Sequence, residues 1–220
     1  MTRKHYEKFA EYLLQGKEDE AVELVDKLLT LHPRLYLFED IITPAMYYIG
    51  ALWEKNEISV ADEHLATAVC DFVLSRLDAG VYENKFQSKK RKKIILLGAE
   101  EEQHYLGLKM VAGFYREKGW RVRYLGPNLP LNHALRQIKD WQPDVIGLSA
   151  ALSYRLPVVK QMTEAFSQLS WSPGIIIGGR IAKKYDLSNL ETGQVRVVKG
   201  LTEIEQVHNV WKAGVVDETS

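Results

Sequence analysis

The chain has 220 residues, of which 46% are hydrophobic and 26% charged, proportions typical of a soluble globular protein. Lysine plus arginine and aspartate plus glutamate number 29 each, so no net charge draws the chain towards nucleic acid or an anionic membrane. The single cysteine, Cys70, excludes an internal disulfide and fits a reducing compartment. The N-terminus lacks a signal-peptide core, and no apolar run approaches the roughly 18 residues that span a bilayer. We therefore expect a cytoplasmic protein of one large or two small domains, without membrane contact.

Residues 1–82 carry apolar side chains at helical spacing and predict a four-helix bundle. Pro44 lies within the expected third helix, which should kink there or break just before it. Ser59, followed three residues later by Asp62, is expected to cap the fourth helix. Cys70 falls in the middle of that helix and is expected to pack in the core. The expected helices cover about residues 6–14, 18–31, 33–53 and 60–77.

Residues 83–93 are polar and basic, and we interpret them as a solvated linker rather than a nucleic-acid patch. Strand and helix patterns alternate from residue 94 to 220, which predicts a parallel, flavodoxin-like (Rossmann-like) sheet domain with strand order 2-1-3-4-5 and helices on both faces. His208 is expected to be peripheral on the last helix. The expected strands are Lys93–Gly98, Val122–Leu125, Val145–Leu148, Ile175–Gly178 and Val195–Val198, and the expected helices lie near residues 105–118, 131–141, 156–169, 180–185 and 202–213.

One short stretch, Glu102 to Gly107, stands between the first predicted strand of the sheet and the helix that follows it. It places His104 at the carboxyl end of a central strand, where open α/β sheets bind their ligands. The Glu102 carboxylate can hold one ring nitrogen of His104 while the other faces a metal. Gly107 allows backbone or a bulky ligand to come close.

Two further loops are expected at the same edge of the sheet. The loop after the third strand contains Ser149, Leu152 and Ser153, and the loop after the fourth begins with Gly178 and Gly179. Small residues there would leave a slot for something long and narrow, with serine hydroxyls available for hydrogen bonds. Neither a Gly-x-Gly-x-x-Gly fingerprint nor a phosphate-loop Lys-Ser/Thr is present after the first strand, which argues against a dinucleotide or nucleoside triphosphate.

Glu-x-His-x-x-Gly, Ser149 with Ser153, and Gly178-Gly179 together resemble the cobalamin-binding fold of methionine synthase and its relatives, whose pattern is Asp-x-His-x-x-Gly, Ser-x-Leu and Gly-Gly. The resemblance implies that His104 replaces the cofactor's own base as the lower axial ligand of cobalt. The displaced nucleotide tail would then enter the slot. Two residues depart from the pattern: Glu102 is one carbon longer than the usual Asp, and Ala151 stands at the usual Leu position, with Leu152 next to it.

The helical part contains a second match. Trp53, nine intervening residues and then Glu63-His64 resemble the helical cap of cobalamin-dependent photoreceptor transcription regulators, which covers the upper face of adenosylcobalamin. The resemblance implies that Trp53 packs near the adenosyl group and that Glu63 and His64 line its pocket; Val60, one turn before His64, could share that face. In some of those photoreceptors a histidine directly after the tryptophan captures cobalt once light has removed the adenosyl group. Glu54 stands at that position here, so a bis-histidine product made in that way is not expected.

These features favour a cobalamin-binding sensory or regulatory module with no enzymatic activity of its own. It would bind adenosylcobalamin in preference to methylcobalamin and respond to light or cofactor supply, as in photoreceptor signal transduction and transcription regulation. Its output would pass through an unknown partner protein, and homo-oligomerisation stays open. Direct DNA binding is not expected, because the chain begins at the bundle, without a winged helix before it. Two alternatives remain: a corrinoid methyl carrier for a separate methyltransferase, and a cofactor-free interaction protein of the same fold.

Overall fold

A computed structural model describes residues 2–82 and 91–213 of the chain. The chain divides into two compact units, residues 1–86 and 87–220, which we call the helical domain and the sheet domain. The predicted linker, residues 83–93, falls for the most part on residues 83–90, outside the described residues.

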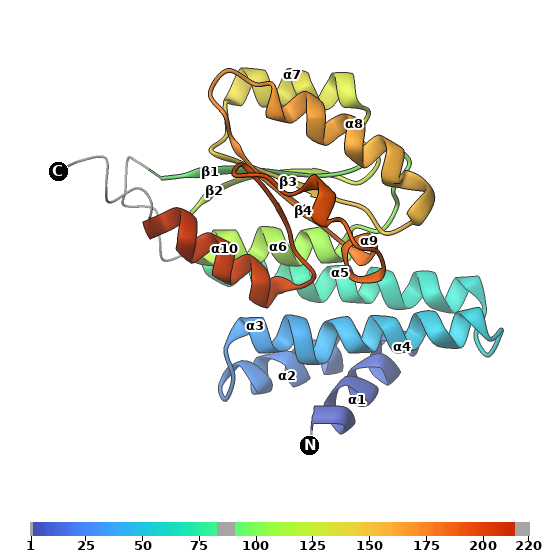
Figure 1. The fold of residues 1–220 in the computed structure, drawn as a ribbon. Coiled ribbons are helices and arrows are strands. Elements are labelled where there is room, and N and C mark those ends of the chain that lie inside the picture. The colour runs from blue at the N-terminus through green and yellow to red at the C-terminus, as the bar shows by residue number, and fades with distance from the viewer. Residues whose placement is uncertain (1, 83–90, 214–220) are drawn as a thin grey trace. The chain divides into compact units, whose positions relative to one another are not determined.

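The helical domain is a bundle (Figure 1). Its third helical stretch contains a π-helical segment. Cys70 is fully buried in its core, as predicted from its position in the middle of a helix. Large apolar side chains fill the same core, among them Phe9, Leu13, Phe38, Ile41 and Ile49. The helices are α1 (Thr2–Leu14), α2 (Glu18–Leu29), α3 (Arg34–Tyr36), the π-helical η1 (Leu37–Ile42), α4 (Thr43–Glu54) and α5 (Val60–Tyr82).

The irregularity expected near Pro44 takes the form of the π-helical segment η1. The backbone N–H of Thr43 bonds to the carbonyl of Phe38, five residues earlier. Proline has no N–H to donate and its ring crowds the carbonyl four residues before it, so a regular α-helical ladder cannot pass through this point. The wider π turn lets the helix continue without the break that the sequence left open.

The sheet domain has five parallel strands in the order β2-β1-β3-β4-β5, which confirms the predicted topology. The register aligns the ends of β1, β3 and β4, because Gly98 pairs with Ser149 and Ser149 pairs with Gly178. The elements are β1 (Lys93–Gly98), α6 (Leu106–Glu117), β2 (Arg121–Gly126), α7 (Leu131–Trp141), β3 (Val145–Ser149), the 3₁₀ turn η2 (Ser153–Arg155), α8 (Leu156–Ser167), β4 (Gly174–Gly178), α9 (Arg180–Lys184), the 3₁₀ turn η3 (Ser188–Leu190), β5 (Val195–Val197) and α10 (Leu201–Ala213).

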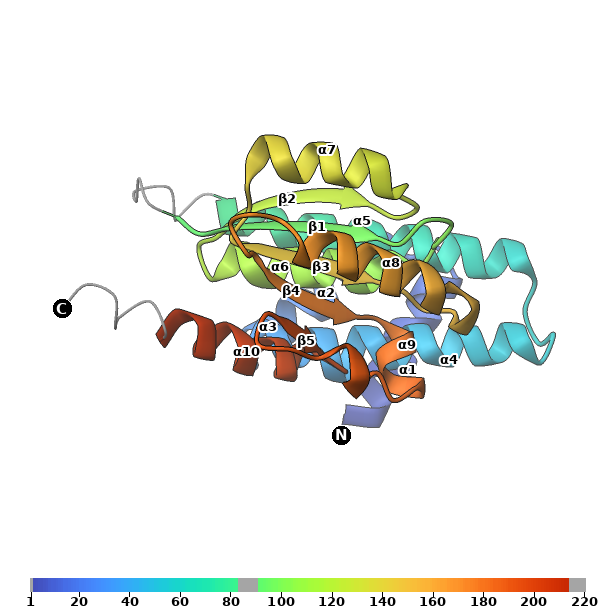
Figure 2. The ribbon, with the colours of Figure 1, turned by 45° about the horizontal axis from the view of Figure 1, so that its top comes forward.

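Helices cover both faces of this sheet (Figures 1 and 2). On one face, Ile138 of α7 and Met162 and Phe166 of α8 pack in a core cluster with Ile95 and Ile146 of the central strands. Helices α6 and α10 lie on the other side of the sheet in Figure 1. Strands covered on both faces must be apolar on both, which explains the nearly continuous hydrophobic runs in β1, β3 and β4.

His208 does not lie at the periphery, as its helix position suggested. It is 5% exposed, and its ring lies among the rings of Phe114, Tyr115 and Trp120, with centroid separations of 5.7–6.0 Å. The prediction was wrong because α10 turns this side of the helix towards α6. A histidine has enough apolar ring surface to be accommodated in such an aromatic cluster.

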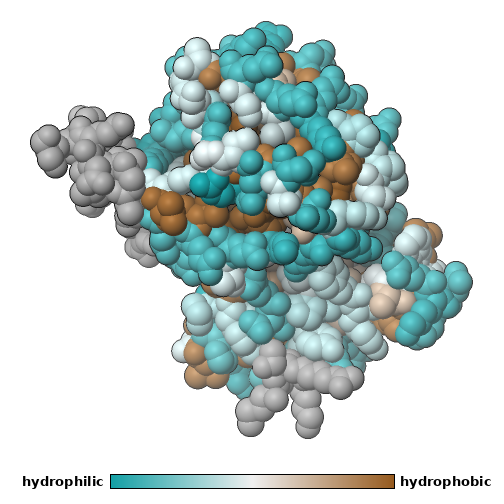
Figure 3. All heavy atoms as spheres, viewed as in Figure 1, coloured by the Kyte–Doolittle hydropathy of each residue, from teal (hydrophilic) through white to brown (hydrophobic). Residues whose placement is uncertain are grey.

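Within the described ranges, no helix is both long enough and apolar enough to cross a membrane. Hydrophilic residues make up most of the surface that is visible in Figure 3. In the sheet domain, the large apolar or aromatic side chains that are most exposed are Tyr154, Tyr185 and Val210.

Candidate functional site

The loop between β1 and α6 turns sharply as soon as the strand ends. The N–H of Ala99 still bonds to the carbonyl of Ser149 at 3.0 Å, in continuation of the sheet. The N–H of Glu102 then bonds back to the carbonyl of Ala99, also at 3.0 Å, and closes a turn. Glu101 lies inside this turn with φ of 61°, a left-handed conformation that is uncommon for a residue with a side chain. The turn directs Glu102 into the protein.

The Glu102 carboxylate is fully buried and bonds to two loops at once. One oxygen, Oε1, accepts the backbone N–H of His104 at 2.9 Å and contacts Nδ1 of its ring at 2.5 Å. The other oxygen, Oε2, accepts the N–H of Ala151 at 2.6 Å. Glu102 therefore joins the loop after β1 to the loop after β3, in addition to holding His104.

The same contacts keep Glu102 ionised. Burial opposes the charge, but the hydrogen bonds from the ring and backbone of His104 and from the backbone of Ala151 outweigh it and lower the pKa of Glu102 to about 2. A carboxylate can only accept hydrogen bonds, so Nδ1 of His104 must carry the proton that it shares with Glu102. This fixes the tautomer of the neutral ring, with its lone pair on Nε2.

His104 is held on one side and open on the other. Its side chain is 48% exposed, and within the described part of the sheet domain Nε2 makes no hydrogen bond. A neutral imidazole with its Nδ1 proton on a buried carboxylate is the usual form of a metal-ligating histidine. The sequence predicted this pairing, and the structure brings the two residues together.

The space next to Gly107 is open. A Cβ atom placed on this residue, in the first turn of α6, would have no atom within 4 Å. Small buried residues, Ala150 and Ala151, follow β3 on the neighbouring loop. Ser149 is buried at the end of β3, Leu152 is partly buried, and Ser153 is exposed.

Gly179 is required by the local backbone. Its φ is +97°, and a Cβ atom here would lie 2.1 Å from the carbonyl oxygen of Ala150. The loops after β3 and β4 touch at this point, since the N–H of Ala150 bonds to the carbonyl of Gly178 at 3.1 Å. At Gly178 a Cβ would approach Val198 to 3.3 Å. This Gly-Gly pair thus keeps the two loops close together, whatever else it contacts.

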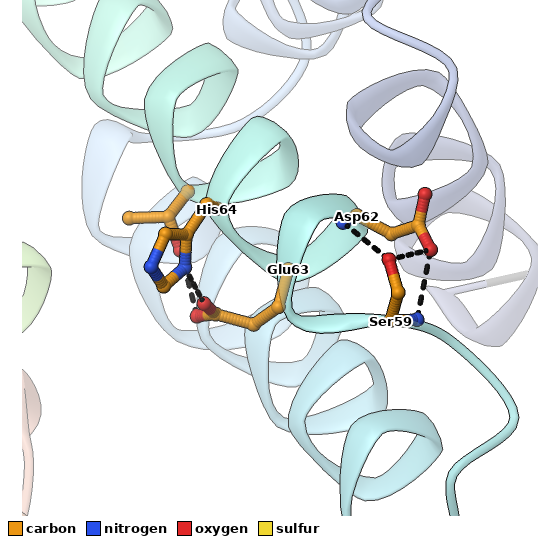
Figure 4. Close-up of polar contacts among 5 residues, drawn as sticks. Ser59, Asp62, Glu63 and His64 are labelled. Carbon is orange, nitrogen blue, oxygen red and sulfur yellow. Dashed lines mark hydrogen bonds and ion pairs between the residues drawn. The ribbon is translucent and has the colours of Figure 1, made fainter.

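The residues predicted in the helical domain lie around the turn that joins α4 to α5. Trp53 is 48% exposed at the end of α4, and Val60 is 55% exposed at the start of α5. Ser59 and Asp62 form the expected capping box: Oγ of Ser59 accepts the N–H of Asp62 at 3.2 Å, and Oδ2 of Asp62 accepts the N–H of Ser59 at 2.8 Å (Figure 4). Hydrogen bonds from Ser59 lower the pKa of Asp62.

Glu63 and His64 form a second carboxylate–histidine pair. Oε2 of Glu63 lies 2.7 Å from Nδ1 of His64, and Oε1 accepts the hydroxyl of Thr67 at 3.0 Å. The two side chains point towards each other in Figure 4, away from the capping box. This pair resembles the Glu102–His104 pair but is more exposed to solvent, since the His64 side chain is 75% exposed and that of Glu63 is 30% exposed.

Sequence reasoning missed three side chains in the sheet domain that hold the His104 loop. They are Glu101, Asn128 after β2 and Arg155 in η2. The Gly126-Pro127-Asn128 turn was a usable signal, since the carboxyl end of β2 opens on the same edge of the sheet. The Arg155–Glu101 contact spans 54 residues and left no local pattern.

Within residues 2–82 and 91–213, no group of three or more His, Cys, Asp or Glu side chains could hold a metal ion by itself.

Comparison with known proteins gives a consistent result. Two family models, each described as a B12 binding domain, match residues 6–78 and 92–204. Over 156 residues the chain is 28% identical to the HTH-type transcriptional repressor CarH of Myxococcus xanthus, an alignment that covers 69% of this chain and 50% of that protein. The chain thus spans about half the length of this relative.

Similarity also extends to corrinoid proteins. The chain is 21% identical over 173 residues to dimethylamine corrinoid protein 3 of Methanosarcina acetivorans, covering 77% of this chain and 80% of that one. The solved structure of the Methanosarcina barkeri monomethylamine corrinoid protein matches with a TM-score of 0.75 at 16% identity, covering 94% of this chain and 98% of that one. At this identity the structural likeness shows a shared fold.

Proposed function

The chain belongs to the B12-binding domain family, and on that premise we propose that it is a regulatory module that binds adenosylcobalamin with His104 as the lower ligand of cobalt. The observation that carries the proposal is the buried Glu102 carboxylate on Nδ1 of His104, which leaves Nε2 as an exposed lone pair. A single histidine suits a corrin, because the macrocycle itself supplies the four equatorial nitrogens. When bound, cobalamin supplies a weak, light-sensitive cobalt–carbon bond.

We propose that the neighbouring loops accept the displaced nucleotide tail. Ser149 and Gly178 end β3 and β4 in register with each other, and Leu152, Ser153 and Gly179 lie on the loops that follow. A Cβ atom added at Gly107, three residues after His104, would have no atom within 4 Å. The role of these residues is to exclude water and to fix the orientation of the tail by hydrogen bonds and close backbone approach.

In the helical domain, Trp53 and Val60 expose large apolar surfaces at one end of the bundle. Covering such side chains with an apolar ligand is favourable, and an indole can lie flat against a planar group. We propose that both contact the adenosyl side of the cofactor. Glu63 and His64 would meet the ribose hydroxyls, with Glu63 kept in place by Thr67.

Two features favour a regulatory role over that of a methyl carrier. They are the Trp-x9-Glu-His spacing and the 28% identity to a protein named as a transcriptional repressor. We propose that light or cofactor supply is the input, and that the output passes through a partner protein or through self-association. The single Cys70, buried in its helix, fits a reducing cytoplasmic location.

A second function is a corrinoid methyl carrier serving a separate methyltransferase. The observation in its favour is coverage: the alignments span 80% of dimethylamine corrinoid protein 3 and 98% of the monomethylamine corrinoid protein, against 50% of the repressor. This reading requires methylcobalamin to be retained. A cofactor-free interaction protein is the third reading, and it requires that no cobalamin be retained.

One experiment separates the three functions. The purified protein is incubated with adenosylcobalamin or methylcobalamin in the dark and desalted, and its visible spectrum is recorded before and after green light. We expect adenosylcobalamin to be retained, with a spectrum of histidine-bound cobalt that changes on illumination. Retention of methylcobalamin alone supports the carrier, and loss of both forms supports the cofactor-free protein.

Two variants assign the residues. His104→Ala should abolish the histidine-bound spectrum, whereas His133→Ala, which removes an exposed histidine of α7, should leave it unchanged. Trp53→Ala should lower retention of adenosylcobalamin more than that of hydroxocobalamin, because only the former carries the adenosyl group. A histidine-bound spectrum that survives in His104→Ala would refute the assigned ligand.

A further inference from the structure

Three loops at the carboxyl edge of the sheet converge on Glu101, the residue directly before the buried Glu102. Its N–H donates to Oδ1 of Asn128, from the loop after β2, at 2.7 Å. Its carboxylate contacts the Arg155 guanidinium, from η2 after β3, in a short ion pair. A second guanidinium nitrogen of Arg155 lies 3.4 Å from the carbonyl oxygen of Glu101. Backbone and side chain of one residue are thus held from two sides.

Glu101 needs this support because its own conformation is unfavourable. A φ of 61° is unfavourable for a residue with a Cβ, and such a conformation persists only where the surroundings enforce it. Asn128 has φ of 54° and stabilises the turn by presenting its side chain to that backbone. Without these partners the turn would relax. Glu102, the next residue in the chain, would then be displaced.

Arg155 differs from an ordinary surface arginine. Its side chain is 15% exposed although its partner Glu101 is 67% exposed, and its guanidinium lies 4.6 Å from the centre of the Tyr154 ring. Contact with a carboxylate and a carbonyl of one residue, on top of an aromatic ring, restricts the guanidinium to one geometry. Most exposed ion pairs contribute little to stability, but a partly buried arginine that holds strained backbone can control a local conformation.

We propose that Arg155, supported by Asn128, is a positioning residue that fixes the loop of residues 99–105 and so aims the His104 imidazole. This rests on the proposed function, because it assigns Arg155 a role in how His104 meets cobalt. Hydrogen bonds already tie the loop to its neighbours, at Ala99 to Ser149 and at Glu102 to Ala151, and Asn128 accepts the Glu101 N–H. The contact between Arg155 and Glu101 adds an ion pair from η2 at the strained residue itself.

The first test needs no cofactor. Amide hydrogen exchange is compared in Arg155→Met, Asn128→Ala and the wild type, with Lys118→Met as the control, since it removes an ion pair to Glu205 elsewhere in the sheet domain. We expect the Glu102 and His104 amides to exchange about tenfold faster in Arg155→Met while β1 amides are unaffected. The proposal would be overturned if these two amides exchange at the wild-type rate in Arg155→Met. It would also be overturned if the exchange rate rises by the same factor at the amides of β1.

A double-mutant cycle tests the link to Glu101. Glycine adopts positive φ without strain, so Glu101→Gly should keep the turn while removing the carboxylate. Arg155→Met should then have little further effect on exchange in the Glu101→Gly background, at most about twofold. A full tenfold effect in that background would show that Arg155 acts by another route, against the proposal.

The second test uses hydroxocobalamin and measures the fraction of cobalt bound by histidine, with His104→Ala as the zero point. We expect Arg155→Met to retain cobalamin but to show about a tenfold lower ratio of histidine-bound to unbound cobalt, and Arg155→Lys to recover part of it. If the wild type shows no histidine-bound cobalt, the proposed function fails. The exchange test still decides whether Arg155 fixes the conformation of residues 99–105. If the wild type and Arg155→Met are alike, the positioning role alone fails.

Discussion

Glu102 and His104 are two residues apart, yet the carboxylate of Glu102 is fully buried while the His104 side chain is 48% exposed. The 2.5 Å contact between Oε1 and Nδ1 crosses the boundary between the protein interior and the open edge of the sheet. A buried charge is stable there because the N–H groups of His104 and Ala151 satisfy it. The interior thus fixes the direction in which the exposed imidazole points.

The ionised state of Glu102 should make stability depend on pH. Its pKa falls from about 4.5 in the unfolded chain to about 2 in the folded protein, so the stabilisation is complete above pH ~5 and is lost progressively as pH falls towards 2. The shift corresponds to roughly 3 kcal/mol. We expect Glu102→Gln to be less stable at pH 7 by an amount of that order, because an amide has only one acceptor oxygen for two groups of donors.

Urea unfolding of the wild type and Glu102→Gln between pH 7 and pH 3 checks this prediction. The difference in the free energy of unfolding should be constant above pH ~5 and shrink below it, because Glu102 of the unfolded wild-type chain takes up a proton while that of the folded protein stays ionised. Comparing the two proteins removes the contribution of the other carboxylates. A difference that is independent of pH down to 3 would contradict the assigned ionisation.

Gly107→Ala should separate binding from stability. No atom lies within 4 Å of the added Cβ, and alanine forms helix more readily than glycine, so the free energy of unfolding should stay the same or rise by up to ~1 kcal/mol. Cobalamin affinity should fall, because the added methyl group enters the space assigned to the corrin. Thermal unfolding without cofactor and a cobalamin titration measure the two effects; unchanged affinity would place the corrin elsewhere.

Gly179→Ala, unlike Gly107→Ala, should destabilise the protein. The added Cβ would lie 2.1 Å from the Ala150 carbonyl oxygen at a φ of +97°, so the loops after β3 and β4 must move apart. We expect a loss of more than ~2 kcal/mol in the stability of the sheet domain. Gly193→Ala is the matched control, since nothing lies within 4 Å of its Cβ. Equal melting temperatures for both variants would show that the contact between the loops is dispensable.

Ser59→Ala should weaken the helical domain. It removes the hydroxyl that accepts the N–H of Asp62 at the start of α5, and the loss of such a cap costs about 1 kcal/mol. Ser75→Ala, in the interior of α5, replaces a serine that bonds to the carbonyl of Asp71 and should be neutral or slightly stabilising. Helical circular dichroism during urea unfolding distinguishes them, and a Ser59 variant as stable as the Ser75 variant would rule out the capping role.

Local patterns in the sequence were sufficient for the strands, the topology and the Glu102–His104 pair. Apolar runs that end in glycine or serine mark strands covered on both faces, and alternation with helices leaves a parallel sheet as the consistent arrangement. The carboxylate and the imidazole are near neighbours in the chain, so their spacing alone allowed the pairing. The capping box of Ser59 and Asp62 was found for the same reason.

Tertiary structure decided the contacts between distant residues. The Ala151 N–H reaches Glu102 across 49 residues, and Arg155 reaches Glu101 across 54, because the register of β1, β3 and β4 aligns the loops that follow them. The burial of His208 depended in the same way on the side that α10 turns to α6. Such contacts follow from strand register and loop conformation, which a periodic pattern of hydrophobic residues does not encode. The sequence by itself determined that Glu102 pairs with His104, because the two residues are near neighbours in the chain, and only the tertiary structure brought the Ala151 N–H to the same carboxylate.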